Sequence, residues 1–136
     1  MSNMLQSDTL KTLVGVYGSL REGLGNHRLL QEAEFVGTDN LPAEYGMVSL
    51  GGFPGVFKGG STSIVLELYL VDANELIRLD QLEGNGSFYT REEVATLAGA
   101  SPWVYLLPKE RYKDQEPVPS GDWKTYLEAQ PSRWRY

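Results

Sequence analysis

A chain of 136 residues is long enough to bury one sizeable core, so we expect a single domain that needs no disulfide or metal to fold. The absence of cysteine excludes disulfides, thiolate zinc sites and cysteine nucleophiles, and it favours a reducing, cytoplasmic setting. A formal net charge of −6 repels polyphosphates, and no apolar run approaches the roughly 20 residues of a membrane-spanning helix. We therefore expect a soluble protein that binds neither nucleic acid nor membranes.

The N-terminal quarter predicts a strand, a glycine turn and a helix. Residues 1–11 are polar and aperiodic, so we expect a flexible extension, with the domain covering residues 12–136. The first strand is expected to begin near Thr12, and Asn26 is placed to N-cap a helix that ends near Gly37. Such a unit gathers unpaired backbone N–H groups, which attract carboxylates and developing oxyanions. On the turn alone, however, a purely structural role is the more common explanation.

The middle of the chain contains the helix with the strongest signals. Between Phe35 and Phe57, short apolar pieces broken by glycine and proline predict extended chain with tight turns. Residues 63–71 then predict a strand that is largely buried on both faces. Asp72, with Glu75 three residues later, has the spacing of a capping box and predicts a helix that ends at Gly84.

The C-terminal third predicts a hairpin followed by a less regular segment. Residues 88–97 and 103–107 are expected to form two strands joined by a short connection. After Pro108 the sequence becomes polar and interrupted by prolines. A last short helix is expected to begin at residues 120–123 and to end at Pro131, before an aromatic, basic tail.

Few residues are suited to carry chemistry. His27 is the single histidine, and we favour a packing or surface role for it over a role in a triad or metal site. Glu67 lies within an apolar strand, so it is either exposed to solvent or a buried acid with a purpose. Glu83 is expected at a helix C-terminus, where the helix dipole and partial burial would raise its pKa and make it a candidate base. Alone, Glu83 would more often be an exposed cap residue.

Several motifs together resemble the gamma-glutamylcyclotransferase-like family, in the branch of gamma-glutamylamine cyclotransferase and the plant AIG2-like proteins. The resemblance covers about residues 14–123. The motifs that carry it are Tyr17-Gly18-Ser19-Leu20-Arg21 with Asn26-His27, Ser49-Leu50-Gly51-Gly52-Phe53-Pro54-Gly55, Glu67-Leu68-Tyr69, Val71-Asp72, Leu79-Asp80-Gln81-Leu82-Glu83-Gly84 with Tyr89 and Arg91, Trp103-Val104-Tyr105, and Ser120-Gly121-Asp122-Trp123. The most specific of these is the helix end Leu-Asp-x-Leu-Glu-Gly followed by Tyr-x-Arg.

The resemblance implies an α+β fold, a small mixed barrel-like sheet flanked by helices, with a cavity between the first turn and the end of the second helix. It implies an enzyme that releases 5-oxoproline and a free amine from a small-molecule gamma-glutamyl amine. The family's catalytic glutamate falls on Glu83. Substrate-binding positions fall on the turn and on two further residues: Tyr17, Gly18, Ser19, Leu20, Glu67 and Tyr89. No cofactor or metal is implied.

Three features depart from the family pattern: Gly15 replaces a bulky residue, Leu66 replaces a common glycine, and residues 1–11 extend beyond the usual start. The enzyme is not the only interpretation of the sequence. A non-catalytic protein that binds a small molecule in the same cavity is the alternative. We favour the enzyme, because a degenerate copy has no reason to retain a base at the unfavourable end of a helix.

Overall fold

The computed structural model describes residues 10–130 and has one mixed sheet with short helices around it. Most of the expected extension, residues 1–9, and the tail, residues 131–136, lie outside the described residues. The elements in chain order are β1 (Thr12–Val16), η1 (His27–Leu30), β2 (Glu34–Ser49), β3 (Pro54–Lys58), β4 (Thr62–Val71), α2 (Ala73–Glu83), β5 (Thr90–Glu93), β6 (Trp103–Leu106), α3 (Lys109–Tyr112), β7 (Glu116–Pro117) and α4 (Trp123–Glu128). Within residues 10–130, no helix is long and apolar enough to cross a membrane.

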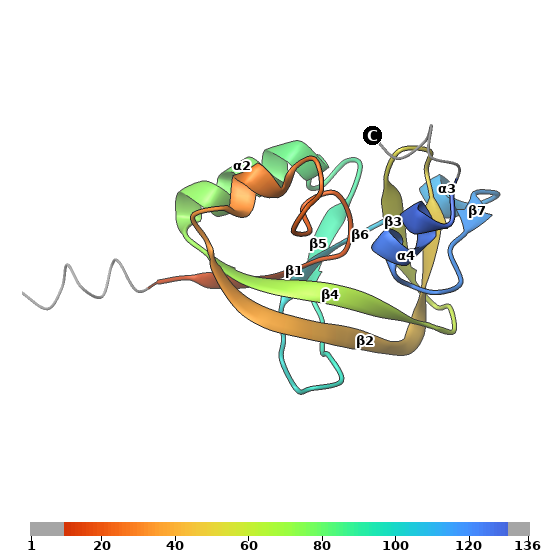
Figure 1. Cartoon of the computed structure of the whole chain (residues 1–136), viewed down its shortest axis with the longest axis horizontal. Helices are drawn as coiled ribbons and strands as arrows, with labels where there is room; N and C mark the ends of the chain where they lie inside the picture. Colours follow the sequence, from red (N-terminus) through yellow and green to blue (C-terminus); the bar gives the residue numbers. More distant parts are fainter. Residues whose placement is uncertain (1–9, 131–136) are drawn as a thin grey trace, which may run out of the picture.

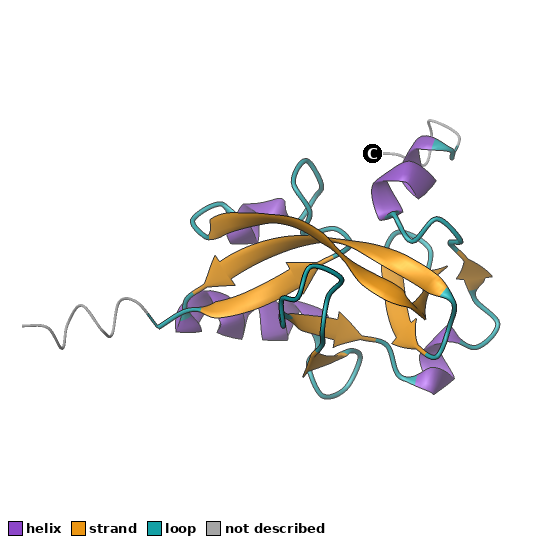
Figure 2. Ribbon diagram, turned by 90° about the horizontal axis from the view of Figure 1, so that it is seen from below, coloured by secondary structure: helices purple, strands orange, loops and turns teal. Residues whose placement is uncertain are grey.

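The sheet curls towards a barrel, which confirms the expected α+β fold. Its strands follow the order β3-β2-β4-β1-β6-β5, with β7 paired to β2, and only the β1–β6 pair is parallel. The two ends approach each other where the backbone N–H of Leu107, just after β6, donates to the carbonyl of Val56 in β3 at 2.7 Å. Figure 2 shows the long strands twisting and bending across the molecule.

Alternate side chains of β4 enter two different cores. Leu66 and Leu68 join buried residues of β2, β3 and β6 inside the curl of the sheet. Tyr69 and Val71 join Leu30 of η1 and Leu79 of α2 in a second core. Figure 1 shows η1 and α2 side by side over one end of the long strands. The near-continuous burial of β4 was expected and is confirmed.

Local sequence signals explain which of the predicted elements the structure contains. Asp72 and Glu75 form a reciprocal capping box, and Gly84 ends α2 in a left-handed conformation with φ of 62°. The helix predicted over α2 is therefore confirmed. The strands predicted at the positions of β1 and β6 are confirmed as well. The first helix was predicted too long, because the chain forms only the four-residue η1 and enters β2 at Glu34. The strand predicted over 88–97 is limited to β5, and α3 and β7 were not foreseen.

Candidate active site

A cavity of about 480 Å³ opens between the turn after β1, the loop before β3 and the C-terminal end of α2. The turn after β1 and the C-terminal end of α2 bring residues from distant parts of the sequence to its walls. Six of the seven residues predicted for the site line it: Tyr17, Gly18, Ser19, Leu20, Glu83 and Tyr89. Glu67 is not among the residues that line it.

The turn places three consecutive residues, Gly18, Ser19 and Leu20, in the lining of this cavity. Gly18 and Leu20 are buried, and Ser19 is half-buried. Within residues 10–130, the backbone N–H groups of Gly18, Ser19 and Leu20 have no acceptor, whereas the turn itself is closed by Arg21 N–H donating to the Gly18 carbonyl at 2.9 Å. Consecutive free N–H groups form a site for a carboxylate or an oxyanion.

Gly18 is required because two loops approach each other closely, and backbone strain plays no part. It is not among the glycines with positive φ. A Cβ atom at this position would instead lie 2.9 Å from Cγ and 3.0 Å from Cδ of Pro54. The ring of Pro54 cannot rotate away, so the close approach of the two loops needs a residue without a side chain.

Asn26 is a residue of the site that sequence reasoning missed. It was expected to cap a helix, but its side chain makes no cap hydrogen bond. Its amide donates to Ser19 Oγ at 2.8 Å, its backbone N–H donates to the Ser19 carbonyl at 2.9 Å, and it lines the cavity. The same side chain caps helices elsewhere, so the pattern hid this role. His27 packs outside the cavity lining, with Nδ1 2.9 Å from the Leu20 carbonyl oxygen.

Glu83 has the properties of a proton acceptor near neutral pH. It is the last residue of α2 and is half-buried in the cavity wall. Among the residues that the structure describes, none donates a hydrogen bond to its carboxylate or forms an ion pair with it. Burial raises the pKa of Glu83 from its ordinary value of 4.5 to about 7. The carboxyl group is thus partly ionised at neutral pH and free to exchange a proton.

Two tyrosines that line the cavity use their hydroxyl groups for structure. Tyr17 donates to the Tyr105 carbonyl at 2.6 Å and accepts from Val56 N–H at 3.3 Å, so it bridges β6 and β3. Tyr89 donates to the carbonyl of Pro54 at 2.7 Å. Burial and then the charge of Glu83 raise the pKa of Tyr89, so this phenol stays neutral.

Tyr105 also lines the cavity and was not predicted as a site residue. Its hydroxyl donates to Asp80 Oδ1 at 2.6 Å, and Arg91 binds both oxygens of Asp80 at 2.8 and 3.2 Å. This network ties α2 to β5 and β6 just before Glu83. It gives a physical reason for Asp80 and Arg91 in the motif at the end of α2, and Tyr105 was detectable only through the separate motif Trp103-Val104-Tyr105.

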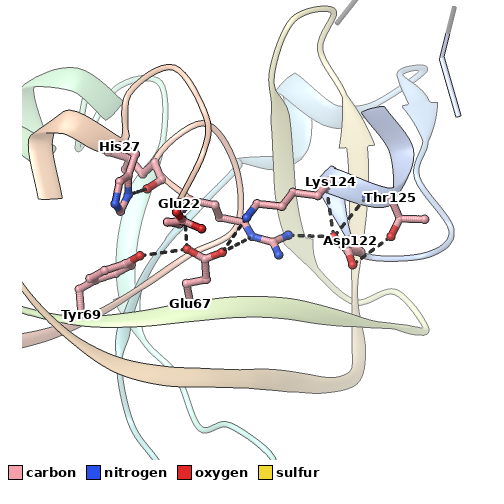
Figure 3. Close-up of polar contacts among 9 residues, drawn as sticks. Glu22, His27, Glu67, Tyr69, Asp122, Lys124 and Thr125 are labelled. Carbon is pink, nitrogen blue, oxygen red and sulfur yellow. Dashed lines mark hydrogen bonds and ion pairs between the residues drawn. The ribbon is translucent and has the colours of Figure 1, made fainter. Parts of the chain in front are cut away.

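Glu67 is a buried acid, but the geometry corrects its predicted place in the cavity. Figure 3 shows its carboxylate at the centre of a network that joins β4, the turn and α4. Its oxygens accept from Arg21 Nε at 3.0 Å, Glu22 N–H at 2.8 Å and Tyr69 hydroxyl at 3.0 Å, and Lys124 Nζ lies 3.3 Å away. Burial opposes ionisation, but these hydrogen bonds and the Lys124 charge outweigh it and lower the pKa of Glu67.

The network fixes the segment that follows the turn. Arg21 is buried and also donates from Nη1 to Asp122 Oδ1 at 2.8 Å, at the N-cap of α4. The oxygens of Glu67 are therefore occupied by the protein itself, which leaves it to hold the turn rather than a ligand. Within residues 10–130, no group of three His, Asp or Glu side chains is arranged to hold a metal ion.

Comparison with known proteins agrees with this architecture. A family model described as gamma-glutamyl cyclotransferase, AIG2-like, matches residues 14–125. The chain is 37% identical over 114 residues to a protein of Vibrio cholerae that is named as a gamma-glutamylcyclotransferase. The alignment covers 84% of this chain and 96% of the relative.

Two solved structures share the fold. The solution structure of ytfP from Escherichia coli is 32% identical, with a TM-score of 0.65, and the match covers 82% of this chain and 96% of that one. An AIG2-like protein from Mus musculus superposes with a TM-score of 0.71 at 22% identity, over 93% of this chain and 95% of that one. The extent of the family match and of these identities shows that the chain belongs to the gamma-glutamyl cyclotransferase, AIG2-like family.

Proposed function

We propose that the protein is a cyclotransferase that releases 5-oxoproline and a free amine from a gamma-glutamyl amine. The observation that carries this proposal is the pairing of two features in one cavity. Glu83 supplies an unpartnered carboxylate with a pKa of about 7, and the turn supplies three N–H groups without acceptors. Membership of the family supports the reaction type.

The substrate carries its own nucleophile, so the protein needs to orient it and move protons. The alpha-ammonium group, with a pKa near 8, gives a proton to Glu83. The resulting amine attacks the gamma-carbonyl carbon, which forms the C–N bond of a five-membered ring. Glu83 then returns the proton to the departing nitrogen as the original amide C–N bond breaks. The ring nitrogen gives up its second proton through Glu83 to the released amine, which leaves as an ammonium ion. The products are the 5-oxoproline anion and that ammonium ion, so atoms and charges balance without a metal or cofactor.

The turn at Gly18, Ser19 and Leu20 has the complementary task. Its N–H groups either bind the alpha-carboxylate of the substrate or stabilise the oxyanion of the tetrahedral intermediate. Removing one such donor in comparable sites costs roughly 3 kcal/mol of transition-state stabilisation. The donors belong to the backbone and are held by the Glu67 network, so they require no reorganisation during the reaction.

The test is incubation with a panel of gamma-glutamyl amines, scored for equimolar 5-oxoproline and free amine. In Glu83→Gln the side chain keeps its size but cannot accept the proton, and we expect turnover to fall at least a hundredfold. Glu92→Gln is the matched control, because Glu92 pairs with Lys58 outside the cavity lining and should keep full activity. Full activity in folded Glu83→Gln would refute the base, and binding without turnover would favour the non-catalytic alternative.

A further inference from the structure

The charges around the cavity restrict the amine that can leave. Among the residues that line it, Glu83 is the only side chain that ionises near neutral pH. Burial is the chief reason that three tyrosines in the lining have raised pKa values and stay neutral: Tyr17, Tyr89 and Tyr105. The volume of the cavity is typical of sites that bind ligands larger than a glutamyl group, so space remains for the substituent of the leaving amine.

Three apolar side chains in the lining of this cavity are exposed or half-buried, which places them where the cavity meets solvent. We call Phe53, Leu82 and Phe88 the apolar rim. Phe53 is 40% and Leu82 42% exposed, and the rings of Phe53 and Phe88 have centroids 6.1 Å apart. The ring of Phe88 also packs on the ring of Tyr89, with centroids 4.9 Å apart in an edge arrangement, so it is held in place.

One cation contacts the apolar rim but is not among the residues that line the cavity. The guanidinium of Arg111 lies 4.4 Å above the ring of Phe88, but Arg111 is not among the lining residues. It therefore supports Phe88 from outside. Exposed apolar side chains gathered at one mouth commonly mark a surface that binds an apolar group.

Resting on the proposed function, we propose that the released amine carries a neutral, apolar substituent, which the apolar rim binds. A second carboxylate on the leaving group would approach Glu83 without a cation in the lining to compensate. A second ammonium group would pair with Glu83 and compete with the alpha-ammonium group for the same base. An aryl or alkyl group meets neither obstacle and gains contact with Phe53 and Phe88.

Three substrates test the proposal one group at a time. Gamma-glutamyl-phenylethylamide and gamma-glutamyl-phenylalanine differ by one carboxylate, and gamma-glutamyl-ethylamide lacks the ring. We expect kcat/KM for the phenylethylamide to exceed each of the others by about tenfold or more. Equal kcat/KM values for the phenylethylamide and the ethylamide would overturn the proposal that the apolar rim binds the substituent. A higher kcat/KM for the phenylalanine compound would overturn the proposal that the substituent is neutral and would point to Arg111 as a binding group.

Substitutions at the rim make the test specific. Phe53→Ala should reduce the preference for the phenylethylamide over the ethylamide to about threefold or less, and Phe53→Arg should shift preference towards the phenylalanine compound. Phe35→Ala is the matched control, because Phe35 is also an exposed ring packed on a tyrosine, at 5.4 Å from Tyr69, but lies away from the cavity lining. It should retain the full preference, and loss of preference in this control would overturn the assignment.

The same compounds separate failure of this inference from failure of the proposed function. If none yields 5-oxoproline, the cyclotransferase proposal fails. Calorimetry of their binding to Glu83→Gln still decides the rim, because the rim residues are unchanged. Tighter binding of the phenylethylamide than of both others supports the apolar rim, and equal or reversed affinities overturn it.

Discussion

Glu83 occupies a position in the helix where a carboxylate is usually unfavourable. Gly84 ends α2 in the left-handed conformation, so the carboxylate of the residue before it lies beside the partial negative charge of the helix C-terminus. Burial in the cavity wall adds to this cost, and the described residues supply no cation to offset it. The residue that destabilises the end of α2 is therefore the one best suited to accept a proton.

This environment predicts the pH dependence of the reaction. Because Glu83 must be ionised to accept a proton, we expect kcat/KM to rise with pH and to level off near an apparent pKa of about 7. Well below that pH, the rise should be about tenfold per pH unit. The profile is measured with a substrate whose own groups do not titrate between pH 5 and 7. A flat profile across this interval would contradict the assignment of Glu83.

At the scale of the elements, the turn after β1 distinguishes backbone from side-chain recognition. Gly18→Val would force a side chain against Pro54, whose carbonyl also accepts from Tyr89, and so it should displace the cavity wall. We expect loss of measurable 5-oxoproline binding and an overpacking cost of about 1–3 kcal/mol. Ser19→Ala keeps the backbone donors and should weaken binding by only about 0.5–1.5 kcal/mol.

Isothermal calorimetry with 5-oxoproline compares the two variants directly. If Ser19→Ala abolished binding while Gly18→Val retained it, recognition would run through the serine hydroxyl. Asn26 would then be its partner, because it donates to Ser19 Oγ. The backbone account of the turn would be wrong.

The network around Glu67 predicts that this buried acid acts on the ligand through the turn. Glu67→Gln removes the charge that holds Arg21 and Lys124, which should cost about 1.5–3 kcal/mol of stability. Because Arg21 follows the turn directly, we expect about tenfold weaker 5-oxoproline binding as well.

The control for Glu67 is another buried carboxylate that holds a loop. Asp39 accepts from the Thr96 hydroxyl at 2.6 Å and from the Ala98 N–H at 3.2 Å, away from the cavity lining. Asp39→Asn should lose stability but keep the affinity for 5-oxoproline. Equal loss of affinity in both variants would show that Glu67 contributes only to folding.

The sequence was informative where structure depends on neighbours in the chain. The capping box of α2, the left-handed Gly84 and the alternation of β4 are local signals, and each was predicted. The contacts of Glu67 join residues up to 57 positions apart, and the sequence could say only that an acid in an apolar strand was exposed or buried with a purpose. Asn26 shows that a local signal can also mislead. Its position before a helix predicted a capping side chain, but that side chain donates to Ser19 in the preceding turn.

Two of the three departures from the family pattern, Gly15 and Leu66, also meet in space. A Cβ atom on Gly15 of β1 would lie only 3.1 Å from Cδ1 of Leu66 in β4 and 3.3 Å from Cγ2 of Val104. Leu66 therefore occupies the volume that a side chain at position 15 would require. The core keeps its packing because a large residue on one strand is matched by a glycine on its neighbour, which no single position in the sequence reveals.

At the scale of the whole molecule, the proposed base should make the protein less stable as pH rises. The folded-state pKa of Glu83, about 7, lies above its ordinary value of 4.5, so the folded protein holds this proton more tightly than the unfolded chain. Well below pH 4.5 both states are protonated and ionisation of Glu83 carries no cost. Between pH 4.5 and 7 the cost grows, and above pH 7 it stays constant at no more than about 3 kcal/mol.

We therefore predict that Glu83→Gln is more stable than the unmodified protein at pH 8 and that this advantage disappears at pH 4. Urea denaturation at both pH values measures it. Asp80→Asn, on the same helix, is the control with the opposite sign. Burial opposes ionisation of Asp80, but hydrogen bonds from Arg91 and Tyr105 outweigh it and lower its pKa, so this substitution should destabilise the protein at pH 8. A Glu83→Gln protein that is less stable at pH 8 would mean that the carboxylate is favourably bound in the folded state, and it would remove the physical basis for a base at this position.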